Sequence, residues 1–241
     1  MKQLKGNGRG STRFFQKKGE DCLDSSILAE YWPLFVKASV VTLRISAFGI
    51  LFSLIVGLVC SFIQYYKIPV LRQIIAVYIE LSRNTPLLVQ LFFIYFGFPM
   101  IGIVWKGETC AVVGVTFLGG SYMAESFRSG LEAVEKNQIE SGESLGMNHW
   151  QVMRYVLFPQ ALAVSIPSIF ANIIFLIKET SIVSGIAIPD LMYTAKDLIG
   201  NDYHTSESLF LLVVWYLIIL LPISLLAGYV EKRLRYAGFG N

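Results

Sequence analysis

The sequence predicts an all-α integral membrane protein, and its composition, hydropathy and apolar segment lengths each support this fold class. Of the 241 residues, 54% are hydrophobic and 15% are charged, whereas a soluble domain carries about 25% charged residues. The mean hydropathy is +0.58. Five apolar stretches approach the roughly 20 residues that a helix needs to cross a bilayer. Apolar and polar residues do not alternate as they do in a membrane β-barrel.

A basic polar tail over residues 1–36 precedes the first of these stretches. Its six basic side chains are not followed by an apolar run within the first 33 residues, so no cleavable secretory signal is predicted. The first apolar stretch must therefore target and anchor the chain itself.

The five predicted spans lie within residues 37–230, and glycine or proline interrupts each of them. Spanning helices tolerate these residues when neighbouring helices satisfy the freed backbone groups, so a packed bundle is expected. The first span extends back through Arg44 if that side chain reaches the interface. In chain order the spans are 38–63, 84–105, 109–127, 155–177 and 208–230, with a polar loop over 129–158 and a tail over 231–241.

The distribution of basic residues predicts a cytoplasmic C-terminus and an external N-terminus. Lysine and arginine favour cytoplasmic loops. With the C-terminus inside, the cytoplasmic segments carry Lys67, Arg72, Arg128, Lys136, Arg154, Lys232, Arg233 and Arg235. The opposite side carries Lys106 and Lys196, with Lys178 at a membrane edge. The basic residues of the N-terminal tail argue the other way, but most lie beyond the 15 to 20 residues over which the rule counts.

Charge and cysteine content exclude several classes of function. The net charge of +3 is too small and too scattered for nucleic-acid binding. Three cysteines without a CxxC or Cys/His cluster support neither a disulfide framework nor a zinc site. His149 and His204 are isolated, and no nucleophilic triad or HExxH pattern occurs, so we expect neither a metal site nor an enzyme.

The polar loop over 129–158 is predicted to form a short amphipathic helix-turn-helix. Gly146 is free to adopt the left-handed conformation that a sharp reversal needs, and Pro159 suits the first turn of the following span. A helix that two spans present at the membrane surface is suited to docking in another protein's groove.

The spacing of Glu140, Gly146, Val156 and Pro159 resembles the EAA loop of type I ABC transporter permeases. The departures from that pattern are Ser141 and Gly142 for two alanines, Val156 for isoleucine and Phe158 for leucine. Further segments resemble the polar amino acid subfamily of these permeases, so that the resemblance covers about residues 38–230. These segments are Thr85 to Phe93 with Tyr95-Phe96-Gly97, the set Tyr122, Glu125, Arg128, Gly130 and Gln138, Pro159-Gln160-Ala161, Lys178-Glu179-Thr180-Ser181, and Pro189-Asp190-Leu191.

This resemblance implies the permease subunit of an ATP-driven, binding-protein-dependent importer for polar amino acids, working by alternating access in a bacterial cytoplasmic membrane. Its expected partners are two ABC ATPase subunits, an extracytoplasmic amino-acid-binding protein and a second permease, either a copy or a related chain. The coupling residues would be Glu140, Glu143, Gly146, Trp150 and Pro159. The chain lacks a GxxxxGK[ST] loop, so we expect it to bind no cofactor, with ATP and Mg on the partner ATPase.

Two polar groups within the predicted spans each have a functional and a structural interpretation. Glu125 and Arg128 lie one helical turn apart and could form a gate or a structural ion pair. A stripe at helical spacing in the fourth span either lines the translocation pathway or makes hydrogen bonds between helices. The stripe consists of Ser165, Ser168, Asn172 and Glu179.

Charged residues near the predicted span ends also have two interpretations. Lys178 and Glu179 could meet the zwitterionic head of an amino acid or act as headgroup anchors, and the anchor interpretation is slightly favoured. Arg83 with Asn84 is interpreted as an anchor at the inner interface. The alternative function is a stand-alone secondary transporter or channel, although no internal repeat supports it. A membrane scaffold and an intramembrane enzyme rank lower.

Overall fold

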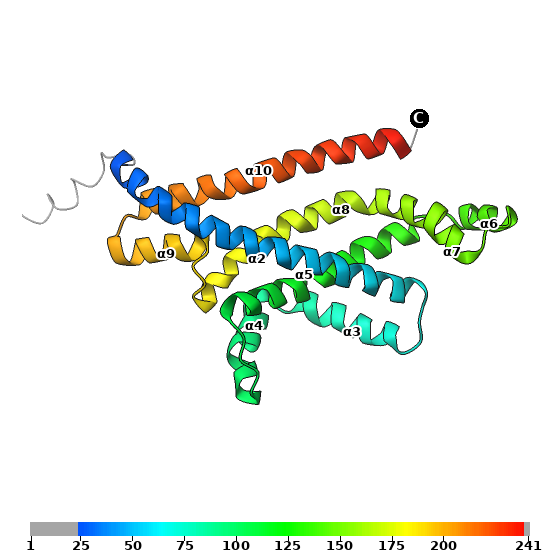
Figure 1. The fold of residues 1–241 in the computed structure, drawn as a ribbon, viewed down its shortest axis with the longest axis horizontal. Coiled ribbons are helices and arrows are strands. Elements are labelled where there is room, and N and C mark those ends of the chain that lie inside the picture. The colour runs from blue at the N-terminus through cyan, green and yellow to red at the C-terminus, as the bar shows by residue number, and fades with distance from the viewer. Residues whose placement is uncertain (1–23, 239–241) are drawn as a thin grey trace, which may run out of the picture.

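The computed structural model describes residues 24–238, with side chains as far as Arg233, and this region is helical apart from short connections (Figure 1). Within the described residues, four helices are long and apolar enough to cross a membrane, and a bent helix pair adds a fifth if it forms one span. The predicted all-α membrane fold class is confirmed. The helices are α2 (Ser25–Tyr65), α3 (Leu71–Asn84), α4 (Leu87–Phe92), η1 (Phe93–Gly97), η2 (Phe98–Ile101), α5 (Gly107–Glu132), α6 (Lys136–Ser144), α7 (His149–Val152), η3 (Met153–Leu157), α8 (Phe158–Glu179), η4 (Thr180–Ile186), α9 (Leu191–Asp202) and α10 (Thr205–Gly238).

The first helix begins earlier than the sequence predicted. Residues 1–36 were expected to form a polar tail, but α2 starts at Ser25, where the side chain of Asp24 accepts a hydrogen bond from the backbone N–H of Ser26. Tyr31 and Phe35 lie four residues apart and are buried against α9 and α10. Burial of this apolar face explains why the helix extends into the predicted tail. Residues 1–23 lie outside the described region.

The second predicted span, 84–105, is wrong in its position and shape. In its place the structure has a pair of helical segments, α3 and Leu87–Ile101, which are bent by 107° relative to each other, as in a broken span or a re-entrant loop. Pro86 disfavours a helical conformation at Thr85, whose φ and ψ of −115° and 134° are extended. The hydropathy pattern missed α3 because this helix carries Arg72, Glu80 and Arg83.

The other predicted spans correspond to observed helices with longer bounds. Span 109–127 lies within α5, span 155–177 within the continuous helix from His149 to Ile186, and span 208–230 within α10. The predicted tail over 231–241 is helical as far as Gly238, and its last three residues lie outside the described region.

Helix α5 is the centre of the bundle and packs between α2 and α8. Val115 and Met123 of α5 are fully buried. A Cβ at Gly57 of α2 would lie 2.4 Å from the Met123 Cβ and 2.8 Å from the Ala124 backbone nitrogen, so the two helices touch backbone to backbone. Small residues allow this close approach without any aqueous driving force.

The two ends of the molecule are built from different elements. Helix α9 lies at one end with the starts of α2 and α10, whereas α6 and α7 project at the other end (Figure 1). At the α9 end, the fully buried Asp190 caps α9 by accepting a hydrogen bond from the backbone N–H of Tyr193 at 2.8 Å. The backbone N–H of Leu191 donates to the hydroxyl of Thr42 at 3.3 Å, which ties this end to α2.

Candidate functional site

The loop between α5 and α8 folds as the predicted helix-turn-helix. Helix α6 ends at a reversal where Gly146 has φ +79°, which confirms the predicted left-handed conformation. The backbone N–H of Met147 donates to the carbonyl of Gly142 at 3.2 Å across this turn. Asn148 then begins α7 in a capping box with Gln151, a feature that the sequence analysis missed although the Asn-x-x-Gln spacing indicates it.

Most of the predicted coupling residues are exposed at the tip of this loop. Glu140, Glu143 and Gly146 are exposed, and Trp150 is 71% exposed. Leu145, which was not predicted, is 81% exposed. Gly142 is buried, and a Cβ there would lie 3.3 Å from Val152, so glycine at this position allows α6 to approach α7 closely. The tip therefore combines apolar and acidic groups on one projecting surface.

Helix α7 continues into α8 without a break. The turn between them, η3, is a π-helix, and Pro159 is the second residue of α8, as predicted for the first turn of that span. Proline lacks the N–H that an α-helix needs at this position, and a π-helical turn accommodates such a local disruption. One continuous helix thus joins the exposed loop to the far end of α8.

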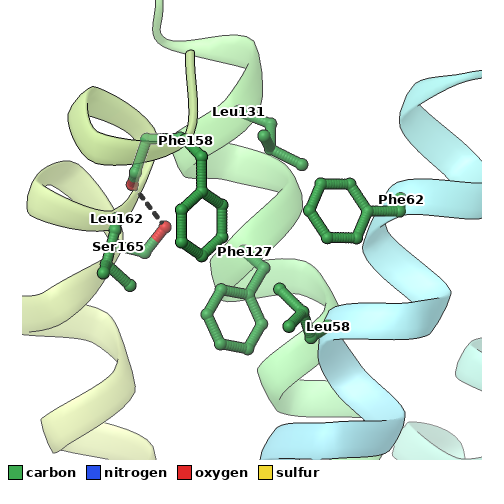
Figure 2. Close-up of a pocket in the computed structure, with 8 residues that line it drawn as sticks. Leu58, Phe62, Phe127, Leu131, Phe158, Leu162 and Ser165 are labelled. Carbon is green, nitrogen blue, oxygen red and sulfur yellow. Dashed lines mark hydrogen bonds between the residues drawn. The ribbon is translucent and has the colours of Figure 1, made fainter. Parts of the chain in front are cut away.

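An aromatic cluster packs between α2, α5 and α8 where the loop joins the bundle (Figure 2). Phe158 of α8 stacks on Phe62 of α2 with 6.3 Å between ring centroids, and Phe127 of α5 lies beside them. The cavity between these side chains has a volume of about 10 Å³ and a mainly apolar lining. This volume is no larger than one water needs, and an apolar site of that kind stays dry. The cluster is packing and holds no ligand.

Glu125 and Arg128 form the ion pair that their spacing predicted. Arg128 hydrogen-bonds Glu125 and also reaches Glu132, at 2.7 Å and 2.8 Å, which the sequence analysis missed. All three side chains belong to α5, at spacings of three and four residues. Because the network does not connect two helices, its geometry favours the structural alternative over the gate.

Two members of the predicted polar stripe, Ser168 and Asn172, bind α8 to α5, and a third, Ser165, packs where the two helices touch. The Ser165 hydroxyl donates to the Ala161 carbonyl at 2.8 Å and lies where α8 touches Gly130 of α5. Ser168 hydrogen-bonds the Ser126 hydroxyl, which also accepts from the amide of Asn172 at 2.8 Å. These contacts favour the interhelical alternative for this part of the stripe.

Helix α3 is fixed against the middle of α5 by hydroxyl groups. The Tyr78 hydroxyl donates to the Phe117 carbonyl at 2.7 Å, and the Ser82 hydroxyl reaches the same oxygen at 2.9 Å. At the bend, the buried amide of Gln90 donates to the Ser82 carbonyl at 2.9 Å and to the Thr85 carbonyl at 3.0 Å. The residues at the end of α3 are therefore held at the depth of the α5 centre.

A polar cleft opens beside this bend between α3, α5 and α8. It consists of two adjoining hollows of about 260 and 270 Å³. We call it the α3–α8 cleft, and its polar lining is Glu80, Arg83, Asn84, Thr85, Tyr122 and Glu179. The Arg83 guanidinium carbon lies 5.1 Å from the centroid of the Tyr122 ring, and that ring contacts Phe175 at 5.2 Å.

This cleft changes the interpretation of two predicted anchors. Arg83 lies beside Tyr122, because the bend at Pro86 places the end of α3 next to the middle of α5, and its side chain is exposed there. Glu179 lines the same cleft, away from the hydrogen bonds of Ser165, Ser168 and Asn172. Lys178, its neighbour, lines a separate groove with Ser181 and Tyr216.

Comparison with known proteins identifies a family. The family model for the binding-protein-dependent transport system inner membrane component matches residues 39–236. A probable amino-acid ABC transporter permease of Bacillus subtilis, YckA, is 35% identical over 81% of this chain and 88% of its own length. The glutamine transport system permease GlnP of Escherichia coli K12 is 32% identical over 84% of this chain and 94% of its own length.

Solved structures agree with these sequence matches. A crystal structure of an amino acid ABC transporter with histidines is 31% identical, has a TM-score of 0.81, and covers 88% of this chain and 100% of its own. The MetNI methionine ABC transporter, in an inward-facing conformation, shares the fold with a TM-score of 0.73 at 19% identity, over 85% of this chain and 98% of its own. The chain therefore belongs to the family of binding-protein-dependent transport system inner membrane components, the permease subunits of ABC importers.

Proposed function

We propose that this permease imports polar amino acids through the α3–α8 cleft. The observation that carries the proposal is that one cation, Arg83, and one anion, Glu179, both line one polar cleft between α3, α5 and α8. Charged side chains at membrane depth are expensive and mark substrate pathways. A zwitterionic amino acid brings both complementary charges in one molecule.

Within the cleft, each end of the substrate has a complementary group. The guanidinium of Arg83 suits the α-carboxylate, because its planar donors match the two carboxylate oxygens. The carboxylate of Glu179 suits the α-ammonium group. The rings of Tyr122 and Phe175 supply the apolar wall that a small-molecule site needs.

The exposed loop between α5 and α8 supplies the contact with the partner ATPase. We assign Glu140, Glu143, Leu145, Gly146 and Trp150 to the surface that docks on a partner ABC ATPase dimer, which binds ATP and Mg. Aromatic and apolar side chains surrounded by polar ones are typical of the centre of such an interface. The continuous helix from α7 to α8 connects this surface to Glu179, so closure of the ATPases would be transmitted to the cleft.

The same proposal includes the orientation of the chain in the membrane and its assembly with a second permease. The loop lies on the cytoplasmic side with the C-terminus, and α9 lies outside, where an amino-acid-binding protein delivers the substrate. A second permease, either a copy or a related chain, completes the translocation pathway in the cytoplasmic membrane. Glu80, Arg83 and Asn84 are exposed in the single chain at membrane depth, which supports a covered or water-filled face there.

Co-purification from the native membrane followed by reconstitution tests this function. The C-terminally tagged chain should retain an ATPase subunit with a phosphate-binding loop, and vesicles should take up labelled polar amino acids only with ATP and the binding protein. Gly146→Pro and Glu140→Lys should abolish both properties and leave the chain in the membrane. The matched control is Glu30→Lys, which changes an exposed glutamate near the start of α2, far from the loop. Uptake by the chain alone without ATP would instead support a secondary transporter.

A further inference from the structure

A groove between α8, α9 and α10 is separate from the α3–α8 cleft. Its volume is about 350 Å³, which lies in the range of small-molecule sites, and its lining is mainly apolar. Val213 and Leu217 in its wall are exposed, so the groove opens on the apolar outer face of α10. We call it the α8–α10 groove, and it is lined by Lys178, Ser181, Met192, Leu212, Val213, Tyr216, Leu217 and Leu220.

The groove is polar at one end and apolar along the rest. Helix α8 ends and α10 begins at the α9 end of the molecule (Figure 1). Lys178 and Ser181, from the end of α8 and from η4, therefore place their polar groups at that end. The α10 wall runs away from it between Leu212 and Leu220, over about 12 Å. A cation at the mouth of an apolar channel matches the shape of an amphiphile.

The cation at the polar end has no salt-bridge partner. Lys178 is exposed and takes part in none of the ion pairs among the described side chains. Its neighbour Glu179 lines the α3–α8 cleft instead, because adjacent residues point about 100° apart around a helix. Neither Glu179 nor the buried Asp190 lines the groove, so a negatively charged ligand meets no carboxylate on its walls.

The headgroup, and not the acyl chain, decides which lipid such a groove prefers. An acyl chain that leaves the bilayer for the groove exchanges one apolar environment for another, so it provides little preference. A lysine attracts an anionic headgroup by its charge. In phosphatidylethanolamine the ammonium group offsets the phosphate, whereas phosphatidylglycerol keeps a net negative charge.

From this charge and shape we infer that the α8–α10 groove binds one anionic phospholipid. The phosphate lies at Lys178 and Ser181, and an acyl chain lies along α10 from Leu212 to Leu220. In the orientation proposed above, the lipid belongs to the outer leaflet. Only this choice of leaflet rests on the proposed function.

Native mass spectrometry of the purified permease–ATPase complex tests the headgroup contact. In detergent with equal amounts of phosphatidylglycerol and phosphatidylethanolamine, the complex should retain phosphatidylglycerol in about fivefold excess, the factor that one lysine near an anionic headgroup contributes. Lys178→Gln should remove this preference. The control Lys37→Gln makes the same charge change at an exposed lysine of α2 outside the groove and should leave the preference intact.

A bulky substitution tests the apolar channel independently of charge. Leu217→Trp fills part of the groove and should lower the retention of both lipids several-fold. The matched control Leu225→Trp makes the same change farther along α10, at a leucine that is 73% exposed and outside the groove. Equal retention by the two tryptophan variants, or an unchanged preference in Lys178→Gln, would refute the lipid site.

Cross-linking in the native membrane separates a lipid from a second permease as the occupant. A photo-reactive amino acid in place of Val213, on the open wall of the groove, should form an adduct with a phospholipid. An adduct with a second permease chain would show that this chain covers the groove and would overturn the inference. None of these measurements involves transport, so their failure is distinguishable from failure of the proposed function.

Discussion

Replacing Gly130 with alanine tests the contact between α5 and α8 directly. A Cβ at this position would lie 2.0 Å from the Ser165 hydroxyl oxygen, 2.4 Å from the Ala161 carbonyl oxygen and 3.2 Å from the Ala161 carbonyl carbon. The hydroxyl could rotate away, but the carbonyl belongs to the backbone of α8. The methyl group must therefore push the two helices apart.

The magnitude follows from two opposing effects. Overpacking a well-packed interface costs about 3 kcal/mol when backbone has to move. Alanine recovers about 1 kcal/mol of helix propensity relative to glycine. The expected net loss is about 2 kcal/mol. Gly228 of α10 is the matched control, because a Cβ there meets nothing within 4 Å, and Gly228→Ala should gain up to about 1 kcal/mol.

Thermal unfolding in mild detergent, followed by intrinsic fluorescence, measures both variants. At about 2–4 °C per kcal/mol, Gly130→Ala should lower Tm by about 4–8 °C and Gly228→Ala should raise it slightly. The double variant Gly130→Ala with Ser165→Ala should remain destabilised, because the Ala161 carbonyl is still in the way. Recovery of the wild-type Tm in that double variant, or equal behaviour of the two glycine variants, would refute the backbone contact.

Three further predictions concern other parts of the fold. Burial raises the pKa of Asp190 from its ordinary value of about 3.8 to about 6, so the folded state binds the proton more tightly and stability should fall as pH rises from about 4 to about 6. The change is about 3 kcal/mol at most. Asp190→Asn keeps the cap, and its unfolding should show a flatter pH dependence over this range. Gln90→Leu leaves the Ser82 and Thr85 carbonyls without their donor and should lower the free energy of unfolding by about 1–3 kcal/mol. Thermal unfolding in mild detergent, followed by intrinsic fluorescence, measures this loss, and the exposed control Gln138→Leu should have little effect. Gly146→Ala places a Cβ at φ +79° and should cost about 1 kcal/mol and reduce ATP-dependent uptake, and an unchanged uptake rate would contradict its role in the turn.

The sequence predicted the parts of the fold that depend on local signals. The third, fourth and fifth spans are long apolar runs, and such runs have few alternatives in a bilayer. The reversal at Gly146 was also predictable, because a glycine after an amphipathic helix commonly takes a left-handed conformation.

The parts that failed depend on contacts between distant residues. The bent span at Pro86 mixes charged and apolar residues, so a hydropathy window cannot place α3. The cleft forms only because Tyr78 and Ser82 bind the Phe117 carbonyl, which brings Arg83 to Tyr122. No spacing rule within one segment contains this information.

The unbroken helix from His149 to Ile186 has a thermodynamic consequence. Its 38 residues measure about 57 Å at 1.5 Å per residue, and they carry Trp150 near one end and Glu179 near the other. A tilt of about 5° around one end would displace the other by about 5 Å, the rise of nearly one helical turn. Since both ends move as one body, any ligand that prefers one tilt biases the other end by the same free energy. If the cleft binds the amino acid and the loop docks on the ATPase as proposed, the amino acid must alter the affinity of the loop for the ATPase by the same factor by which the docked ATPase alters the affinity for the amino acid.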